Sequence, residues 1–361
     1  MPQKRLTYFD TVKGIGIFLV LLGHFQGEWF FSLSPYVSPL CTWIFSFHMP
    51  LFFIVSGMLI HYRRDTEKDL KDLTSRRFYS IMIPYFWFSL IYLLIVLYAL
   101  IRGSVTVHVL FEQIWYVLSM YGMNVLWFLP ALFGGEILFL LIYKRFVKIT
   151  PLIVLVLTGA ATAANYALSS LSADVFPWKY LKEFGITLLR PVFVCVFIAV
   201  GFYIYKLFRE REKYCLPELL AGLALMAVNI FVHPLNRAVD FRSLVQGNLA
   251  FYYIAAVTGS VGLILICKNL PAIRPVTFWG INSLIVMAVH NNETVLYLGM
   301  KLAMIINQYI TRARGYVSYL VVTIVMVVYT TLMILLINRF FGFLVGKPSP
   351  FDRLLKKKKE A

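Results

Sequence analysis

The chain has 361 residues, of which 60% are hydrophobic, 17% are aromatic and only 14% are charged. A soluble domain is closer to about 45–50% apolar and about 25% charged, so this composition excludes an ordinary soluble protein and indicates a membrane protein. The net charge of +17 could indicate nucleic-acid binding, but the basic residues are scattered between apolar spans. No soluble basic domain is left to hold a duplex, and we expect no nucleic-acid partner.

Ten apolar stretches follow one another, each near the roughly 20 residues that a membrane-crossing helix needs. They cover residues 11–31, 37–60, 78–101, 125–143, 149–168, 186–205, 216–234, 249–267, 276–298 and 316–341. The sequence therefore predicts an all-α fold, a polytopic membrane helix bundle of about ten transmembrane helices. This membrane domain would occupy residues 1–345, followed by a basic cytoplasmic tail at 346–361.

The basic residues also predict an orientation. Placing the N-terminus in the cytoplasm puts 25 of the 34 Lys and Arg residues on that side of the membrane. Because cytoplasmic loops carry the excess of Lys and Arg, we expect both termini to be cytoplasmic in a multi-pass protein of the plasma (inner) membrane. The tail LLKKKKEA suits attraction to anionic lipid headgroups as well as topology.

Four ionisable side chains inside these spans are predicted to lie at similar depth: His24, His48, Glu136 and His290. Eleven positions separate Lys13 from His24 in the first span, about 16 Å along a helix and roughly half of the hydrocarbon thickness. His48 and Glu136 each fall about eleven residues into an inward-running span, and His290 lies past the midpoint of the ninth. Ionisable groups in lipid face the bundle interior or water, so these residues predict a shared polar layer.

Each of these residues also has a purely structural interpretation. A buried histidine can hydrogen-bond a neighbouring helix, and the GGE sequence ending at Glu136 suits close packing around a buried acid. Glu28 follows His24 by one helical turn, so it either orients the imidazole or marks the end of the helix. The four cysteines and the histidines show no metal-ligand spacing, and we expect neither a metal site nor a permanently bound cofactor.

Acid–base chemistry at a buried imidazole remains, because the sequence has no nucleophile elbow, P-loop, HExxH motif or dinucleotide-binding glycine pattern. The ordinary pKa of histidine suits proton transfer near neutral pH, and His24 is the candidate general base. Arg63, Arg64, Arg76 and Arg77 bracket the loop after the second span. Paired guanidinium groups there suit phosphate recognition as well as topology.

The segments that carry these residues resemble the acyltransferase-3 family of membrane O-acyltransferases, in particular its fucose 4-O-acetylase-like branch. In DTVKGIGIFLVLLGH, the acid, base and histidine of the family correspond to Asp10, Lys13 and His24, although many members have arginine at the position of Lys13. The second-span segment FSFHMPLFFIVSGMLI contains His48. RRFYSIMIPYFWF, NVLWFLPALF and WGINSLIVMAVH are similar to later segments, so the resemblance runs through essentially the whole chain.

The resemblance implies an enzyme that moves an acyl group, most commonly acetyl, from a cytoplasmic acyl-CoA to a carbohydrate. The acceptor would be a hydroxyl of a cell-surface or lipid-linked glycan. A thioester is already activated, so the protein mainly has to position the hydroxyl and take its proton, which is the role expected of His24. A transient acyl-imidazole is the alternative. Lys13, Arg76 and Arg77 would bind the CoA phosphates, with Asp10 orienting Lys13.

The remaining candidates complete the expected site. His48 would orient the acceptor or polarise the thioester carbonyl, His290 would line the acceptor side, and Glu136 belongs to the candidate catalytic set. A transporter or flippase for a glycan or lipid-linked sugar is the competing hypothesis, since a bundle with a central polar layer also suits a proton-coupled carrier. The Lys13–His24 spacing together with the FHMPLFF segment favours the enzyme.

Overall fold

A computed structural model describes residues 5–25, 38–171, 176–207, 214–236, 239–290, 293–312 and 314–347. The regular elements in these ranges are helices, apart from one isolated bridge between Asp240 and Val245. Eight of the described helical segments are long and apolar enough to cross a membrane. The expected all-α, polytopic membrane bundle is therefore confirmed.

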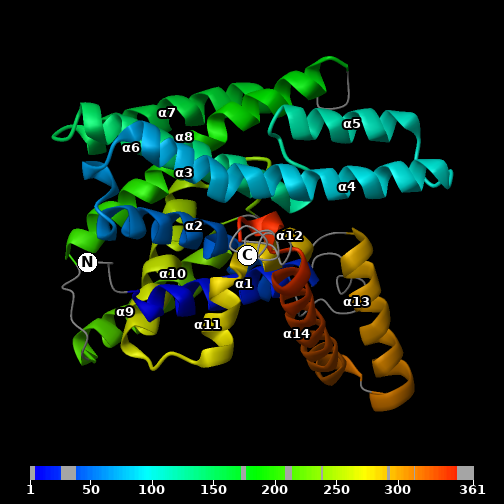
Figure 1. Cartoon of the computed structure of the whole chain (residues 1–361). Helices are drawn as coiled ribbons and strands as arrows, with labels where there is room; N and C mark the ends of the chain where they lie inside the picture. The colour runs from blue at the N-terminus through cyan, green and yellow to red at the C-terminus, as the bar shows by residue number, and fades with distance from the viewer. Residues whose placement is uncertain are drawn as a thin grey trace, which may run out of the picture.

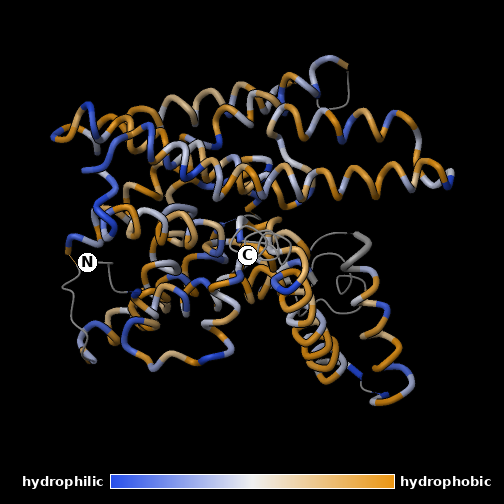
Figure 2. Tube along the Cα trace, viewed as in Figure 1, coloured by the Kyte–Doolittle hydropathy of each residue, from blue (hydrophilic) through white to orange (hydrophobic). Residues whose placement is uncertain are grey.

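The long helices follow the predicted spans in order. They are α2 (Ser38–Tyr62), α4 (Ile83–Ile101), α6 (Phe128–Arg145), α7 (Thr150–Ser169), α8 (Trp178–Leu207), α9 (Leu216–Val232), α10 (Leu249–Asn269) and α14 (Gly315–Phe340). Short helices join them: α3 (Leu70–Arg77) continues through a π-helical turn into α4, α5 (Val107–Leu118) follows α4, and the 3₁₀ turn η4 (Asn124–Trp127) precedes α6. Figure 2 shows hydrophobic residues along the long helices and hydrophilic residues gathered mainly at their connections.

Two of the ten predicted spans differ from the prediction. The first is α1 (Thr7–Phe25), a helix of 19 residues that starts earlier than expected and is made less apolar by Asp10, Lys13 and His24. The ninth was expected to be one helix and is divided. It consists of α11 (Arg274–Ile281) and α12 (Ser283–His290), and α13 (Glu293–Ile305) follows. Glu28 and most of the basic tail, residues 348–361, lie outside the described residues.

The division of the ninth span occurs at Asn282, where the backbone leaves the helical conformation (φ −107°, ψ 17°). The Asn282 amide donates to the Phe278 carbonyl at 2.8 Å, which satisfies an acceptor at the end of α11. The Asn282 side-chain oxygen accepts hydrogen bonds from Asn338 at 2.8 Å and from Lys347 at 3.2 Å. A short side chain that hydrogen-bonds nearby backbone competes with the helix, which explains the interruption.

The central helices are arranged in a continuous series of neighbours. α8 packs against α2, α6 and α7, while α10 joins α2 to α9, and α1 lies between α2 and α11. Figure 1 shows two further helical pairs, α4 with α5 and α13 with α14, extending from this central group. α1 also packs against α12, so α1, α2 and α12, which carry the predicted histidines, meet inside the bundle.

Glycines allow two of these helix pairs to touch backbone to backbone. A Cβ added to Gly57 of α2 would lie 2.0 Å from the Ile198 carbonyl oxygen of α8, and one added to Gly201 would lie 2.0 Å from the Ile54 oxygen. Gly280 of α11 is equally close to the α1 backbone, 1.7 Å from the Asp10 oxygen. Small residues at helix crossings are the usual route to close packing in membranes, where apolar burial alone gives little preference.

Polar side chains add interhelical hydrogen bonds beside this packing. Asn229 of α9 is fully buried and donates to the Ser46 hydroxyl at 3.2 Å and to the Ala255 carbonyl at 2.8 Å. Ser260 of α10 donates to the Phe47 carbonyl at 3.2 Å. These bonds fix the turn of α2 that immediately precedes His48.

Gly57→Ala should lower the free energy of unfolding by about 2 kcal/mol or more, because the added methyl group has to push α2 away from α8. Gly159→Ala is the matched control, since nothing lies within 4 Å of a Cβ at Gly159. The control should stay within about 1 kcal/mol of the wild type. Unfolding of the purified proteins in detergent measures both effects, and equal midpoints for the two variants would contradict the close approach.

Candidate active site

A cavity of about 520 Å³ lies where α1, α2, α6 and α12 meet, a volume typical of small-molecule sites. Its wall includes ionisable residues from these helices, from α3 and from the segments after α2 and before α10. They are Lys13, His24, His48, Arg63, Arg77, Glu136, Asp240, Arg242 and His290. The four residues predicted to share one polar layer all line this cavity. The common depth is confirmed for the three histidines only, because Glu136 contacts Ser56 and Arg77, about 12 Å along α2 from His48.

Three histidines form the centre of the cavity, here called the histidine centre: His24, His48 and His290. The ring centroids of His24 and His290 are 4.9 Å apart. Phe45 bridges the other pair, with its ring 6.1 Å from His24 and 5.2 Å from His48. Residues from three helices that are remote in sequence therefore surround one small volume.

Backbone hydrogen bonds fix the tautomer of two of these rings. His290 Nδ1 lies 3.0 Å from the Val286 carbonyl oxygen and 2.9 Å from the Met287 oxygen, and His48 Nδ1 lies 2.9 Å from the Ile44 oxygen. A carbonyl oxygen only accepts, so Nδ1 carries the hydrogen in both residues and Nε2 of the neutral ring is an acceptor. His290 is 3% exposed and its Nε2 has no hydrogen-bond partner in the described protein.

A second group of residues, here called the basic end, consists of Lys13, Arg63 and Arg77. Ser56, which lines the cavity next to this end, follows His48 by eight residues, or about 12 Å along α2. Lys13 is separated from His24 by about 16 Å along α1 by the same measure. The basic end and the histidine centre are therefore two distinct parts of one cavity.

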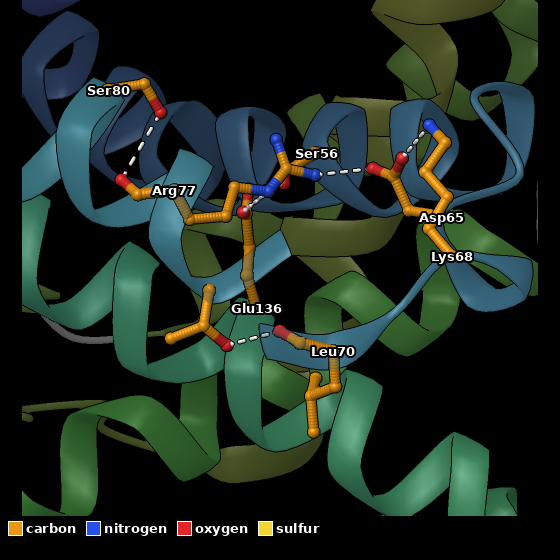
Figure 3. A network of polar contacts seen from close by, with 8 residues as sticks. Ser56, Asp65, Lys68, Leu70, Arg77, Ser80 and Glu136 are labelled. Carbon is orange, nitrogen blue, oxygen red and sulfur yellow. Dashed lines mark hydrogen bonds and ion pairs between the residues drawn. The ribbon is translucent and has the colours of Figure 1, made fainter. Parts of the chain in front are cut away.

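Buried carboxylates hold Arg77 in place, as Figure 3 shows. Arg77 Nη2 lies 2.6 Å from Asp65 Oδ2, and Arg77 Nε forms an ion pair with Glu136 Oε2 at 2.8 Å. The Ser56 hydroxyl donates to the other oxygen of Glu136, and Lys68 donates to Asp65 at 2.6 Å. This arrangement fixes the guanidinium plane at the cavity wall, and it makes Glu136 a partner of Arg77 rather than a free acid.

Arg63 differs from Arg77 because no carboxylate of the described residues forms an ion pair with it, although Asp65 and Glu136 act on it electrostatically. Its side chain is exposed and lines the cavity, and it makes no hydrogen bond or ion pair with another residue in the described part of the chain. The sequence singled out Arg63 as one of four clustered arginines but did not select it as a donor ligand. The basic end therefore combines two cations that form ion pairs, Lys13 and Arg77, with one guanidinium that forms none among the described residues.

The other two candidate donor residues lie outside the cavity wall. Asp10 is buried and bridges Arg5 at 2.7 Å and Lys13 at 3.0 Å, and its hydrogen bond raises the pKa of Arg5. This contact is consistent with the expected orientation of Lys13 by Asp10. Arg76 is exposed and does not line the cavity, although it directly precedes Arg77.

The remaining polar part of the cavity wall comes from a segment that sequence analysis did not select, residues 239–248, here called the Asp240 segment. Asp240 and Arg242 line the cavity together with Trp127 and Tyr252. Phe241 stacks on Trp127, with the ring centroids 5.7 Å apart and the planes 13° from parallel. Trp127 directly precedes α6, whereas Glu136 lies nine residues, or about 13.5 Å, further along that helix, so the Asp240 segment and the basic end are well separated.

Arg190 of α8 anchors the Asp240 segment from behind. It is 1% exposed, donates to the Arg242 carbonyl at 2.9 Å and to the Tyr121 carbonyl at 2.7 Å, and lies 4.5 Å from the Tyr121 ring centroid. A charged residue within an apolar span, Arg190 in the predicted span 186–205, is a sequence signal that points to this region. Among the described residues, no group of three His, Cys, Asp or Glu side chains is placed to hold a metal ion.

Comparisons with known proteins identify the family of this chain. The family described as "Acyltransferase domain" matches residues 6–339, which is nearly the whole chain. The nodulation protein NolL of Mesorhizobium japonicum is 36% identical over 99 residues, a match that covers 26% of this chain and 25% of that protein. No solved structure gives a significant match. The length of the family match shows that the chain belongs to the acyltransferase-3 family of membrane-bound acyltransferases.

Proposed function

We propose that this protein transfers an acyl group, most simply acetyl, from a cytoplasmic acyl-CoA to a hydroxyl of a cell-surface or lipid-linked carbohydrate. The single observation that carries this proposal is that one cavity is lined both by the basic end and by the histidine centre. An acyl-CoA has its phosphates and its thioester at opposite ends of the pantetheine arm, and it needs cations at one place and a proton acceptor at another.

The donor end follows from charge and geometry. Arg77 and Arg63 present guanidinium groups, which bind phosphate oxygens in a bidentate manner, and Lys13 adds a point charge. Because Asp65 and Glu136 hold Arg77, its donors need little reordering when an anion binds. The positive-inside distribution of basic residues supports a cytoplasmic position for this end in the plasma membrane, where acyl-CoA would be available.

The reaction then takes place at the histidine centre. The acceptor oxygen attacks the thioester carbonyl carbon while His24 takes the hydroxyl proton; the C–O bond forms, the C–S bond breaks, and the proton passes to the departing thiolate. His290 presents an unprotonated Nε2 close to His24, which stabilises the imidazolium formed in this step. His48 offers the same kind of acceptor and orients the hydroxyl.

Mass spectrometry of surface glycans from cells with and without this protein tests the proposal. We expect a mass difference of one acyl group, and the difference should vanish after mild alkali because esters are cleaved by base. Glycans that are identical in mass, but that fail to cross the membrane when the protein is missing, would instead support a carrier.

Arg63→Gln should raise the KM for acyl-CoA about 10-fold while kcat changes little, because the arginine binds phosphate by charge and takes no part in the bond changes. Arg63 has no carboxylate partner among the described residues, so its removal strands no buried acid. Arg64→Gln is the control, since Arg64 is exposed beside Arg63 and does not line the cavity. Initial rates against labelled acetyl-CoA measure both variants, and an unchanged KM for Arg63→Gln would remove it from the donor site.

His24→Gln should reduce acyl transfer by about 10²–10⁴-fold, since glutamine can hydrogen-bond the hydroxyl but cannot take its proton. The purified variant should keep its elution profile in detergent. His108→Gln is the matched control, because His108 is exposed on α5 and lies outside the cavity wall. Transfer of label from acetyl-CoA to alkali-treated surface glycan gives the rates. Near-normal transfer by His24→Gln would show that another group accepts the proton.

A further inference from the structure

Asp240, Arg242 and Tyr252 form a part of the cavity wall to which the proposed donor binding and proton transfer assign no role. Tyr252 is 1% exposed, and its hydroxyl has no hydrogen-bond partner within the described residues. The Arg242 Nε is buried and likewise lacks an acceptor there. A buried hydroxyl and a buried guanidinium N–H without hydrogen-bond partners destabilise a folded protein. A ligand that hydrogen-bonds both groups would remove this free-energy cost.

The charges in this part of the wall differ from those of the basic end. Asp240 supplies one carboxylate and Arg242 one guanidinium, so the two lining charges balance. The basic end combines Lys13, Arg63 and Arg77 with the single lining acid Glu136. A phosphate-bearing ligand is therefore favoured at the basic end, whereas the Asp240 segment suits a neutral ligand with many hydroxyl groups. Carboxylate oxygens accept from such hydroxyls, and a guanidinium and a phenol donate to them.

The geometry of the Asp240 segment is fixed before any ligand binds. Asp240 Oδ1 accepts the Arg242 backbone N–H at 2.9 Å, and the Asp240 and Val245 backbones are paired by hydrogen bonds of 2.9 and 2.8 Å. Arg190 holds the Arg242 carbonyl, and Asn165 donates to the Leu244 carbonyl at 3.0 Å. Asp240 itself is exposed, so this fixed segment can be reached from outside the cavity. A preformed site of this kind loses little conformational freedom on binding.

We infer that the Asp240 segment with Tyr252 is the acceptor subsite, and that it binds a neutral glycosyl residue through its hydroxyl groups. This inference rests on the proposed function, since it assigns the acceptor of that reaction to Asp240, Arg242 and Tyr252. The acceptor enters beside Asp240 and meets the acyl group at the histidine centre. The acyl donor enters from the basic end, so the two substrates approach from different parts of the cavity.

Kinetics with two varied substrates test this assignment. The probes are labelled acetyl-CoA and the surface-glycan fraction of the source cells after removal of its esters by mild alkali. Asp240→Asn should raise the apparent KM for the glycan about 10- to 100-fold, and Tyr252→Phe about 3- to 10-fold, because a hydrogen bond to a charged group contributes more than one to a neutral group. The KM for acetyl-CoA should stay within about twofold of the wild type.

The controls are matched in chemistry. Asp72→Asn changes an exposed carboxylate on α3, and Tyr253→Phe changes the tyrosine next to Tyr252, and neither residue lines the cavity. Both controls should keep the glycan KM of the wild type. If Asp240→Asn and Tyr252→Phe also keep it, or if they raise only the KM for acetyl-CoA, the subsite is wrong. If wild-type protein transfers no label to the glycan, the proposed function fails, which is a different result.

Discussion

The two ion pairs of Arg77 fix its guanidinium group at the cavity wall, and much of the site depends on them. Asp65 follows α2, Arg77 ends α3 and Glu136 lies on α6, so one guanidinium joins three elements. Removing either acid would leave Arg77 with one carboxylate instead of two, whereas removing Arg77 would leave the buried Glu136 without its ion pair, a change that commonly costs about 3–5 kcal/mol. The Ser56 hydrogen bond to Glu136 extends the network to α2, the helix that also carries His48. Through Ser56 and His48, α2 therefore contacts both the basic end and the histidine centre.

The apolar surroundings explain why such a network is held by close contacts. In a bilayer, packing one apolar side chain against another is favoured little over contact with lipid, so position is set by backbone approach and hydrogen bonds. Gly57 and Gly201 allow the backbones of α2 and α8 to approach closely. Asn229 of α9 hydrogen-bonds both α2 and α10. The outer faces of the bundle can then remain uniformly hydrophobic while α2 stays in register with its neighbours.

Sequence reasoning located much of this site because depth along a helix follows directly from residue number. His24, His48 and His290 could be assigned to one layer, and all three line the cavity. Residue number alone could not show which of the adjacent residues Arg76 and Arg77 faces the cavity. Adjacent residues point about 100° apart around a helix, and only the contact between α3 and α6 shows which of them faces the cavity. The Asp240 segment lies between two spans and has no periodic pattern, and its place depends on Arg190, remote in sequence.

The fixed tautomers of His48 and His290 determine which kind of ligand these two rings favour. Both rings direct a lone pair rather than a hydrogen toward neighbouring groups when they are neutral, because each Nδ1 hydrogen is held by the preceding turn. A bound alcohol can donate its hydrogen to either lone pair, with its own oxygen lone pairs turned toward the donor. An ester has no hydrogen to donate and meets only repulsion between lone pairs at the same position. In the reaction proposed here, the same two backbone bonds would orient the alcohol acceptor, weaken binding of the ester product and favour its departure.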